Sequence, residues 1–333
     1  MAETSLKPLL NEVDVIGRVK EINLETGETL KGKENIKGNV IISVQEKVGE
    51  EVRLHDIRVR VYSNKFKRDG NINGLYTGYE TVMNEYKSIA EVGNKEDADL
   101  VHVQGSLELN EFVGRDGAKH SSVQVNARFF NRITPEDVKK RKGPKAIAKV
   151  EAVVENIKDE LDTDGLPSGG KKLSAFNVDY FGQLNENSQP IVPFEAVVPE
   201  ALADAFSDLY DTNDTGKFTL KINNYAEEAQ AEDVEEVSGF GNTEELKKVK
   251  RNFVNNLEVI GGTESYTEPK AYDEEQIEEA KQWRKKALDK LESPYVPTET
   301  PSNNAFGEGS KTEKNVEKSI TDEDLSELEE LDF

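Results

Sequence analysis

Residues 101–133 read VHVQGSLELNEFVGRDGAKHSSVQVNARFFNRI, and this stretch decides the fold. On both sides of the Gly-Arg-Asp-Gly sequence at 114–117, apolar and polar residues alternate, which is the pattern of two half-buried strands joined by a turn. Gly105 lies inside the first strand, where a glycine commonly marks a bulge or a sharp bend. The residues expected to face the core are Val101, Val103, Leu107 and Leu109 in the first strand and Val123, Val125, Ala127 and Phe129 in the second.

Three more strands and a helix precede this hairpin. The strands are expected at residues 13–22, 39–46 and 57–66, and the helix at residues 79–92. The order strand, strand, strand, helix, strand, strand is that of the OB-fold, a five-stranded barrel that binds oligonucleotides across its second and third strands and their loops. The sequence therefore predicts an OB-fold domain over residues 11–135.

The next part of the chain repeats this order of elements. Five further segments with strand patterns and one amphipathic helix predict a second OB-like domain over residues 145–265, although the two units share little sequence. The helix starts after Pro199, a residue type that is favoured at helix beginnings. The expected strands are residues 148–161, 172–184, 190–198, 217–227 and 251–261, and the expected helix is residues 199–211.

Two further segments follow the second unit. Residues 273–292 predict a helix that begins acidic and ends basic, in agreement with the helix dipole. Residues 293–333 have the composition of a flexible linker that ends in the acidic tip TDEDLSELEELDF. The whole chain is thus predicted to be mainly β with helices: tandem OB-fold-like five-stranded barrels plus a disordered acidic C-terminal tail.

Charge is distributed unevenly along the 333 residues, whose formal net charge is −23. Residues 1–150 contain 25 basic and 23 acidic side chains, whereas residues 151–265 contain 9 basic and 24 acidic ones. A nearly neutral first unit inside so acidic a chain favours an anionic partner for that unit.

Composition and motifs exclude several other functions. The absence of cysteine removes disulfides, thiolate zinc sites and cysteine nucleophiles, and three histidines are too few for a histidine-rich metal site. The sequence at 165–171 resembles a P-loop but lacks the Ser or Thr that would hold magnesium, and a calcium-like loop from Asp211 has Ile222 in place of the bidentate Glu. We therefore expect no catalytic residue, no metal and no cofactor.

The sequence also predicts where in the cell the protein is located. No apolar run is long enough to span a membrane, and the N-terminus lacks the pattern of a cleaved signal. A cytoplasmic protein that does not bind membranes is expected, in the host cytoplasm if the source is viral.

The hairpin at 101–133 resembles the fourth and fifth strands of bacterial-type single-stranded-DNA-binding proteins. The acidic tip with its final phenylalanine resembles the tips of such proteins from bacteria and many phages. The resemblance implies a non-catalytic protein that protects single-stranded DNA (ssDNA) in phage DNA replication or recombination and recruits replication or recombination proteins through its tip. Two barrels per chain fit a monomer or a homodimer. The alternatives are a recombination strand-annealing protein, an acidic structural or assembly protein without DNA binding, and a metal-dependent nuclease.

Single strands are bound by basic groups along the phosphates and by aromatic rings on which bases stack. The expected ssDNA-binding residues are Arg18, Arg58, Arg60, Tyr62, Lys65, Phe66, Lys67, Arg68, Phe112, Arg115, Arg128 and Phe130. The expected partner-binding residues of the tip are Asp322, Asp324, Glu329, Glu330, Asp332 and Phe333. The alternative interpretation makes Tyr62 and Phe130 rim residues that pack against the second unit, and the tip a solubilising run of charge.

Overall fold

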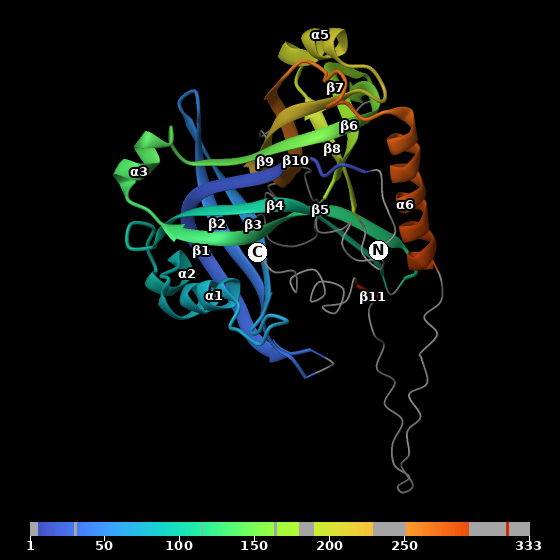
Figure 1. Cartoon of the computed structure of the whole chain (residues 1–333). Coiled ribbons are helices and arrows are strands. Elements are labelled where there is room, and N and C mark those ends of the chain that lie inside the picture. The colour runs from blue at the N-terminus through green and yellow to red at the C-terminus, as the bar shows by residue number, and fades with distance from the viewer. Residues whose placement is uncertain are drawn as a thin grey trace, which may run out of the picture.

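The computed structural model describes residues 6–29, 32–114, 116–162, 165–179, 190–228, 251–292 and 318–319. Its strands form one sheet (Figure 1). The strands are β1 (Asn11–Glu28), β2 (Glu34–Val48), β3 (Glu51–Asn64), β4 (Leu100–Val113), β5 (Lys119–Arg132), β6 (Lys145–Leu161), β7 (Pro167–Val178), β8 (Ile191–Val198), β9 (Thr215–Glu228), β10 (Arg251–Gly262) and β11 (Lys318–Ser319). The helices are α1 (Gly74–Glu85), α2 (Ile89–Val92), α3 (Pro135–Lys140), α5 (Glu200–Leu209) and α6 (Glu274–Glu292). In these parts of the chain no helix is long and apolar enough to cross a membrane.

The first five strands close into a barrel. β1 pairs with β2 and β4, β2 with β3, and β4 with β5, all antiparallel. A short parallel pairing of β3 with β5 completes the ring. Two helices, α1 and α2, stand between β3 and β4 where a single helix was expected. This connectivity is the OB-fold topology.

The next five strands close in the same way. β6 pairs with β7 and β9, β7 with β8, and β9 with β10, all antiparallel, and β8 pairs with β10 in parallel. Helix α5 lies between β8 and β9 in the chain, as α1 lies between β3 and β4. The predicted fold class, tandem OB-fold-like barrels in a mainly β protein, is confirmed.

β1 joins the two barrels. Its first third, from Asn11 to Ile16, pairs with β6, while the same strand also pairs with β4 and β2. The inward-facing side chains of both barrels belong to one cluster of buried apolar residues. Val15 and Val40 of the first barrel and Ala148 and Leu220 of the second are fully buried members of that cluster. The two barrels therefore pack against each other and are not separate domains joined by a linker.

Gly105 lets β4 and β5 approach closely. A Cβ atom at this position would lie 2.0 Å from the carbonyl oxygen of Asn126, so no side chain fits there. At this point β5 contains one extra residue, Arg128, between the residues that pair with Gln104 and Gly105. The bulge expected at Gly105 is present, and the inserted residue belongs to the partner strand.

The bulge reverses the alternation of β5 and corrects two expectations. Phe129, which was expected to face the core, is 57% exposed. Phe130, which was expected to point away from the core, packs against it, with its ring edge-on to Tyr79 at a centroid distance of 6.2 Å. An extra residue in a strand moves every residue after it to the opposite face of the sheet. The alternation of apolar and polar residues in the sequence does not reveal where such a residue is inserted.

Helix α6 covers part of the outer surface of the second barrel (Figure 1). Its Ile277 and Ala280 are buried in a second apolar cluster together with outward-facing residues of β6, β7 and β8. Asp273 caps the helix and accepts a hydrogen bond of 2.8 Å from the backbone N–H of Gln276. The predicted helix is thus present, and it docks on the second barrel.

Candidate nucleic-acid interface

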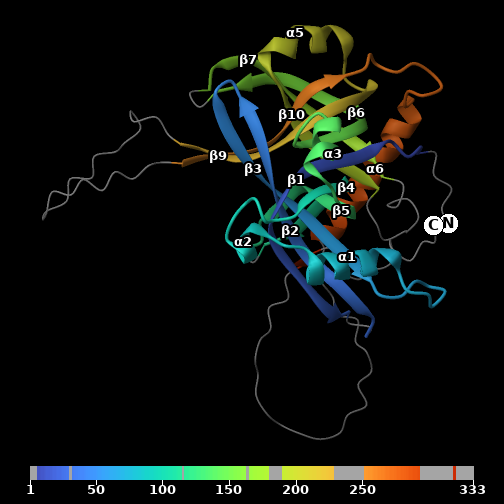
Figure 2. The same ribbon diagram turned by 90° about the vertical axis from the view of Figure 1, so that its left-hand side faces the viewer.

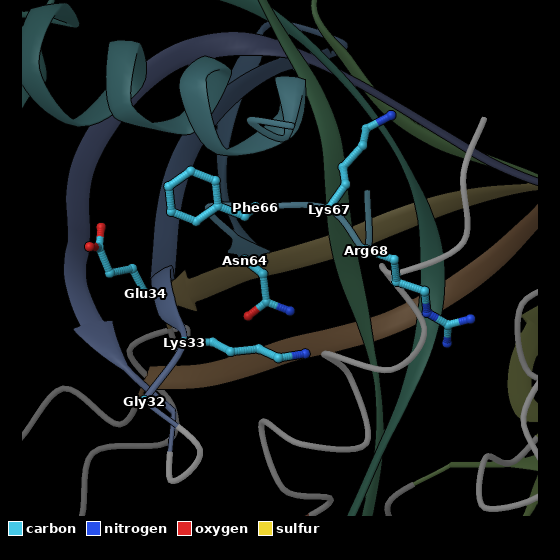
Figure 3. A pocket seen from close by; sticks show the side chains of 7 residues that line it. All are labelled: Gly32, Lys33, Glu34, Asn64, Phe66, Lys67 and Arg68. Carbon is cyan, nitrogen blue, oxygen red and sulfur yellow. The ribbon is translucent and has the colours of Figure 1, made fainter. Parts of the chain in front are cut away.

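A cleft of about 460 Å³ lies where the β1–β2 hairpin meets the chain that leaves β3 (Figure 3). The backbone N–H of Lys65 donates a hydrogen bond of 2.8 Å to the carbonyl of Glu34 and holds the two segments together. A bridge between Phe66 and Ile72 folds the loop that follows. The residues that line the cleft are Gly32, Lys33, Glu34, Asn64, Phe66, Lys67 and Arg68.

The lining combines positive charge with one aromatic ring. The nitrogens of Lys33, Lys67 and Arg68 lie on one side of the cleft, and the carboxylate of Glu34 points to the opposite side (Figure 3). The ring of Phe66 is 46% exposed. Cations that follow phosphates and a ring on which a base stacks are the two components of a single-strand site, so this cleft has the chemistry of a nucleotide-binding surface.

Lys65 supports the ring rather than lining the cleft. Its ammonium lies 5.6 Å from the ring centroid of Phe66 and 6.0 Å from that of Tyr76, distances typical of cation–π contacts. Its hydrogen bond to Glu34 raises the pKa of the Lys65 ammonium, which is therefore charged at neutral pH. This ion pair also neutralises the single carboxylate at the edge of the cleft.

Three predicted binding residues alternate along the outer side of β3, and their exposure differs. Arg58 is exposed, and within the part of the chain that the structure describes no ion pair reaches it. Arg60 lies 3.1 Å from the carboxylate of Glu108, and its side chain is 21% exposed. Tyr62 is only 2% exposed, so its ring is not accessible for stacking in this structure, contrary to the expectation of an exposed ring. The end of β3 is buried on both faces, which the alternating pattern does not predict.

Arg18 lies on the outer side of β1 and is bound to the loop before β4. Its guanidinium donates hydrogen bonds to the carbonyls of Glu96 (3.1 Å) and Ala98 (2.7 Å) in the segment before β4. The side chain is 17% exposed. Its contacts are those of a residue that fixes a loop.

The β4–β5 hairpin contributes one accessible ring system. Phe112 is half-buried and stacks on His120 with a centroid distance of 5.0 Å and an interplanar angle of 21°. Arg128 is the half-buried bulge residue. Arg115 lies outside the described residues, as do all six residues predicted for the tip. β11 pairs with β4 beside Phe112 and Val113.

Sequence reasoning missed two residues with the properties of a single-strand site. Lys33 enters the cleft from the β1–β2 hairpin, and the lysine-rich KGKEN sequence at 31–35 could have indicated it. Phe129 offers a ring that is 57% exposed, and only the bulge in β5 places it on the surface.

Two closed five-stranded barrels, joined through β1 and carrying a basic, aromatic cleft at the β1–β2 hairpin, define a tandem OB-fold protein. The YorF family is the one to which this chain belongs, since the model of that family matches residues 10–294.

Solved structures with some likeness to this chain include single-stranded-DNA-binding proteins. The wild-type protein from Thermus aquaticus is 14% identical with a TM-score of 0.47, and 81% of this chain and 100% of that one are covered. The small protein from Streptomyces coelicolor is 14% identical with a TM-score of 0.26, over 38% of this chain and 95% of that one. A Plasmodium falciparum protein in complex with ssDNA is 14% identical with a TM-score of 0.25, over 40% and 100%. No curated protein sequence matches significantly. The fold assignment therefore rests on the strand pairings themselves.

Proposed function

We propose that this protein binds ssDNA without catalysing a reaction on it, and that residues 11–135 form the binding domain. The observation that carries the proposal is the cleft that is lined by Lys33, Lys67 and Arg68 together with the exposed ring of Phe66. Arg58, exposed on β3, extends the basic surface toward the middle of that strand. The phosphates of an unpaired strand would meet the cations while a base stacks on the ring.

The same chemistry predicts how binding responds to salt and to sequence. Four cations that contact phosphates give a slope of about −3 in a plot of log affinity against log salt concentration, since each contributes about −0.7 on single strands. Stacking accepts any base, so sequence preference should be weak. A steep salt dependence with little preference among oligonucleotides is therefore expected.

The experiment is a fluorescence-anisotropy titration of labelled oligo-dT at several salt concentrations. The double variant Lys67→Ala/Arg68→Ala should bind more weakly than the parent, with a salt slope smaller by about 0.7 for each lost contact. The matched control is Lys285→Ala/Lys290→Ala, which removes two exposed cations from α6. If both variants weaken binding equally, the loss of affinity is due to the change in net charge and not to the cleft. If the parent protein does not bind oligo-dT, the proposal is refuted.

The rival functions are tested in the same assay. Duplex DNA and RNA of the same length establish the preference for unpaired DNA. Added magnesium reveals a nuclease through shortening of the oligonucleotide, and a complementary strand reveals an annealing protein through faster pairing. The proposed function predicts an intact oligonucleotide and no acceleration of pairing.

We further propose that the protein acts in phage DNA replication or recombination, as a monomer or homodimer, and that its tip recruits partner proteins. The support is the sequence of residues 321–333, in which seven carboxylates precede the final phenylalanine. An anionic peptide competes with DNA for cations in a salt-dependent way and can offer its end to a partner's basic, apolar pocket. Deletion of residues 321–333 should tighten ssDNA binding at low salt and abolish binding to a replication protein. If neither changes, the tip is a solubilising segment only.

A further inference from the structure

The chain between β5 and β6, which connects the two barrels, carries a dense cluster of positive charge. Residues 138–150 contain six basic side chains and no acidic one. Four of the six are consecutive and exposed, at the end of α3 and in the turn after it: Lys139, Lys140, Arg141 and Lys142. Figure 1 shows α3 at the side of the molecule opposite α6, and in Figure 2, where that side faces the viewer, α3 lies in front of the strands. We call these four residues the α3 turn.

Carboxylates neutralise little of the charge of the α3 turn. Lys140 lies 3.8 Å from Asp137. That carboxylate also accepts hydrogen bonds from the backbone N–H and the hydroxyl of Thr134, which lower the pKa of Asp137. In the part of the chain that the structure describes, no salt bridge reaches the other three cations, Lys139, Arg141 and Lys142.

The helix itself accounts for only part of this charge. The C-terminus of a helix carries about −0.5 of an elementary charge, which a single nearby cation offsets. The further cations of the same turn repel one another, and this repulsion opposes folding. An anion bound at the α3 turn would relieve that repulsion, so the cluster favours an anionic ligand.

The backbone of the turn gives a second, independent indication. Lys142 has the left-handed φ of 66°, and its N–H donates a hydrogen bond of 3.1 Å to the carbonyl of Lys139, while the N–H of Gly143 donates one of 2.9 Å to that of Val138. These two bonds form a Schellman motif, in which the left-handed position is usually glycine. Helix α2 follows this rule with Gly93 at φ 77°. A side chain at such a position strains the backbone, so a lysine there indicates a role for its charge.

The chemistry of the segment selects the kind of anion. Residues 134–150 contain no aromatic residue, so no base can stack there, and exposed lysine and arginine side chains are suited to phosphates. The cleft is within reach of the same strand of DNA. β1 runs from Glu28, which pairs with Glu34 at the cleft, to Ile16, which pairs with Lys145 after the α3 turn. This part of β1 spans at most about 40 Å, or roughly 12 nucleotides at 3.4 Å each.

We infer that the α3 turn is a second DNA contact, which binds the phosphates of a strand that continues beyond the cleft of the first barrel and does not bind its bases. This inference rests on the proposed function. It predicts that affinity increases with oligonucleotide length through the connector between the barrels.

The test compares labelled oligo-dT of about 6 nucleotides, near the lower size of a single OB-fold site, with oligo-dT of about 40 nucleotides. Anisotropy titrations use the full-length protein at several salt concentrations. For the long oligonucleotide, Lys139→Gln/Arg141→Gln should raise the Kd about threefold or more at low salt and reduce the salt slope by about 1.4. The Kd for the short oligonucleotide should stay within about twofold of the parent value. The matched control, Lys285→Gln/Lys290→Gln, removes two exposed cations from α6.

The variant Lys142→Gly separates charge from structure. Because glycine relieves the strain of the left-handed position, the melting temperature should rise by about 1–3 °C. The salt slope for the long oligonucleotide should nevertheless decrease by about 0.7, since one phosphate contact is lost. A structural role of Lys142 would instead lower the melting temperature and leave the salt slope unchanged.

Three results would overturn the inference alone. They are an unchanged Kd and salt slope for the long oligonucleotide in Lys139→Gln/Arg141→Gln, equal losses for both oligonucleotide lengths, and equal losses in the α6 control. If the parent protein binds neither oligonucleotide, the proposed function is refuted as well.

Discussion

Replacement of Phe66 by alanine removes the one ring that lines the cleft and leaves every charge in place. A stacked base contributes about 1–3 kcal/mol to single-strand binding, so the Kd should rise about 5- to 140-fold. Because Phe66 is 46% exposed in the free protein, the variant should lose no more than about 1 kcal/mol of folding free energy. The change therefore separates stacking from folding and from electrostatics.

The assay is the anisotropy titration with oligo-dT, repeated over a range of salt concentrations. The salt slope of the Phe66→Ala variant should equal that of the parent, since the number of cations that contact phosphates is unchanged. Phe66→Trp should retain affinity because it keeps a ring. The matched control is Phe253→Ala, which removes a side chain that is 77% exposed on β10 of the second barrel. Loss of less than about twofold for Phe66→Ala, or equal losses for both alanine variants, would contradict stacking in the cleft.

Three further predictions concern stability, measured by denaturant unfolding. Phe130→Ala should lower the free energy of unfolding by about 2 kcal/mol because its ring packs on the core. Phe129→Ala should change that free energy by no more than about 0.5 kcal/mol because its ring is exposed. A larger loss for Phe129→Ala than for Phe130→Ala would contradict the bulge. Gly105→Ala should cost about 1–3 kcal/mol or prevent folding, since its Cβ would meet a backbone oxygen at 2.0 Å, and a neutral result would exclude this close approach. Arg284→Ala should cost about 3 kcal/mol at neutral pH by leaving Glu111 buried without its partner. Burial raises the pKa of Glu111, but hydrogen bonds from Arg284 lower it below the ordinary value of 4.5. The parent should therefore lose this contribution as the pH falls below about 4.5, whereas the variant, in which burial alone raises the pKa of Glu111, should gain stability as the pH falls toward about 4.5 from above. Parallel pH profiles would rule out the ion pair as the cause.

The order of apolar and polar residues within short segments of the sequence predicted the strands and helices, because these elements depend on that order. Alternation in residues 13–22, 39–46 and 57–66 placed three strands of the first barrel, and the repeated order of elements predicted the second. The acidic start and basic end of residues 273–292 predicted the helix, but the surface on which it docks depends on which residues of β6, β7 and β8 face outward.

The errors at the candidate site have tertiary causes. Phe129 and Phe130 exchanged faces because one extra residue in β5 lies opposite Gly105, and the contact between two strands decides where such an insertion goes. Tyr62 is buried although the pattern placed it on the outer side of its strand. Lys33 joins Phe66 in the cleft only because the β1–β2 hairpin folds against the end of β3, a meeting of segments far apart in the sequence.

The pairing of β1 with β6 has a consequence for how the molecule comes apart. The ladder from Asn11 to Ile16 and the common apolar cluster connect both barrels. If one barrel unfolds, the other therefore loses hydrogen bonds and buried apolar surface. The chain should therefore unfold in one cooperative transition. Cleavage of the chain between residues 135 and 145 should give two fragments with unpaired, aggregation-prone strand edges rather than two independent barrels.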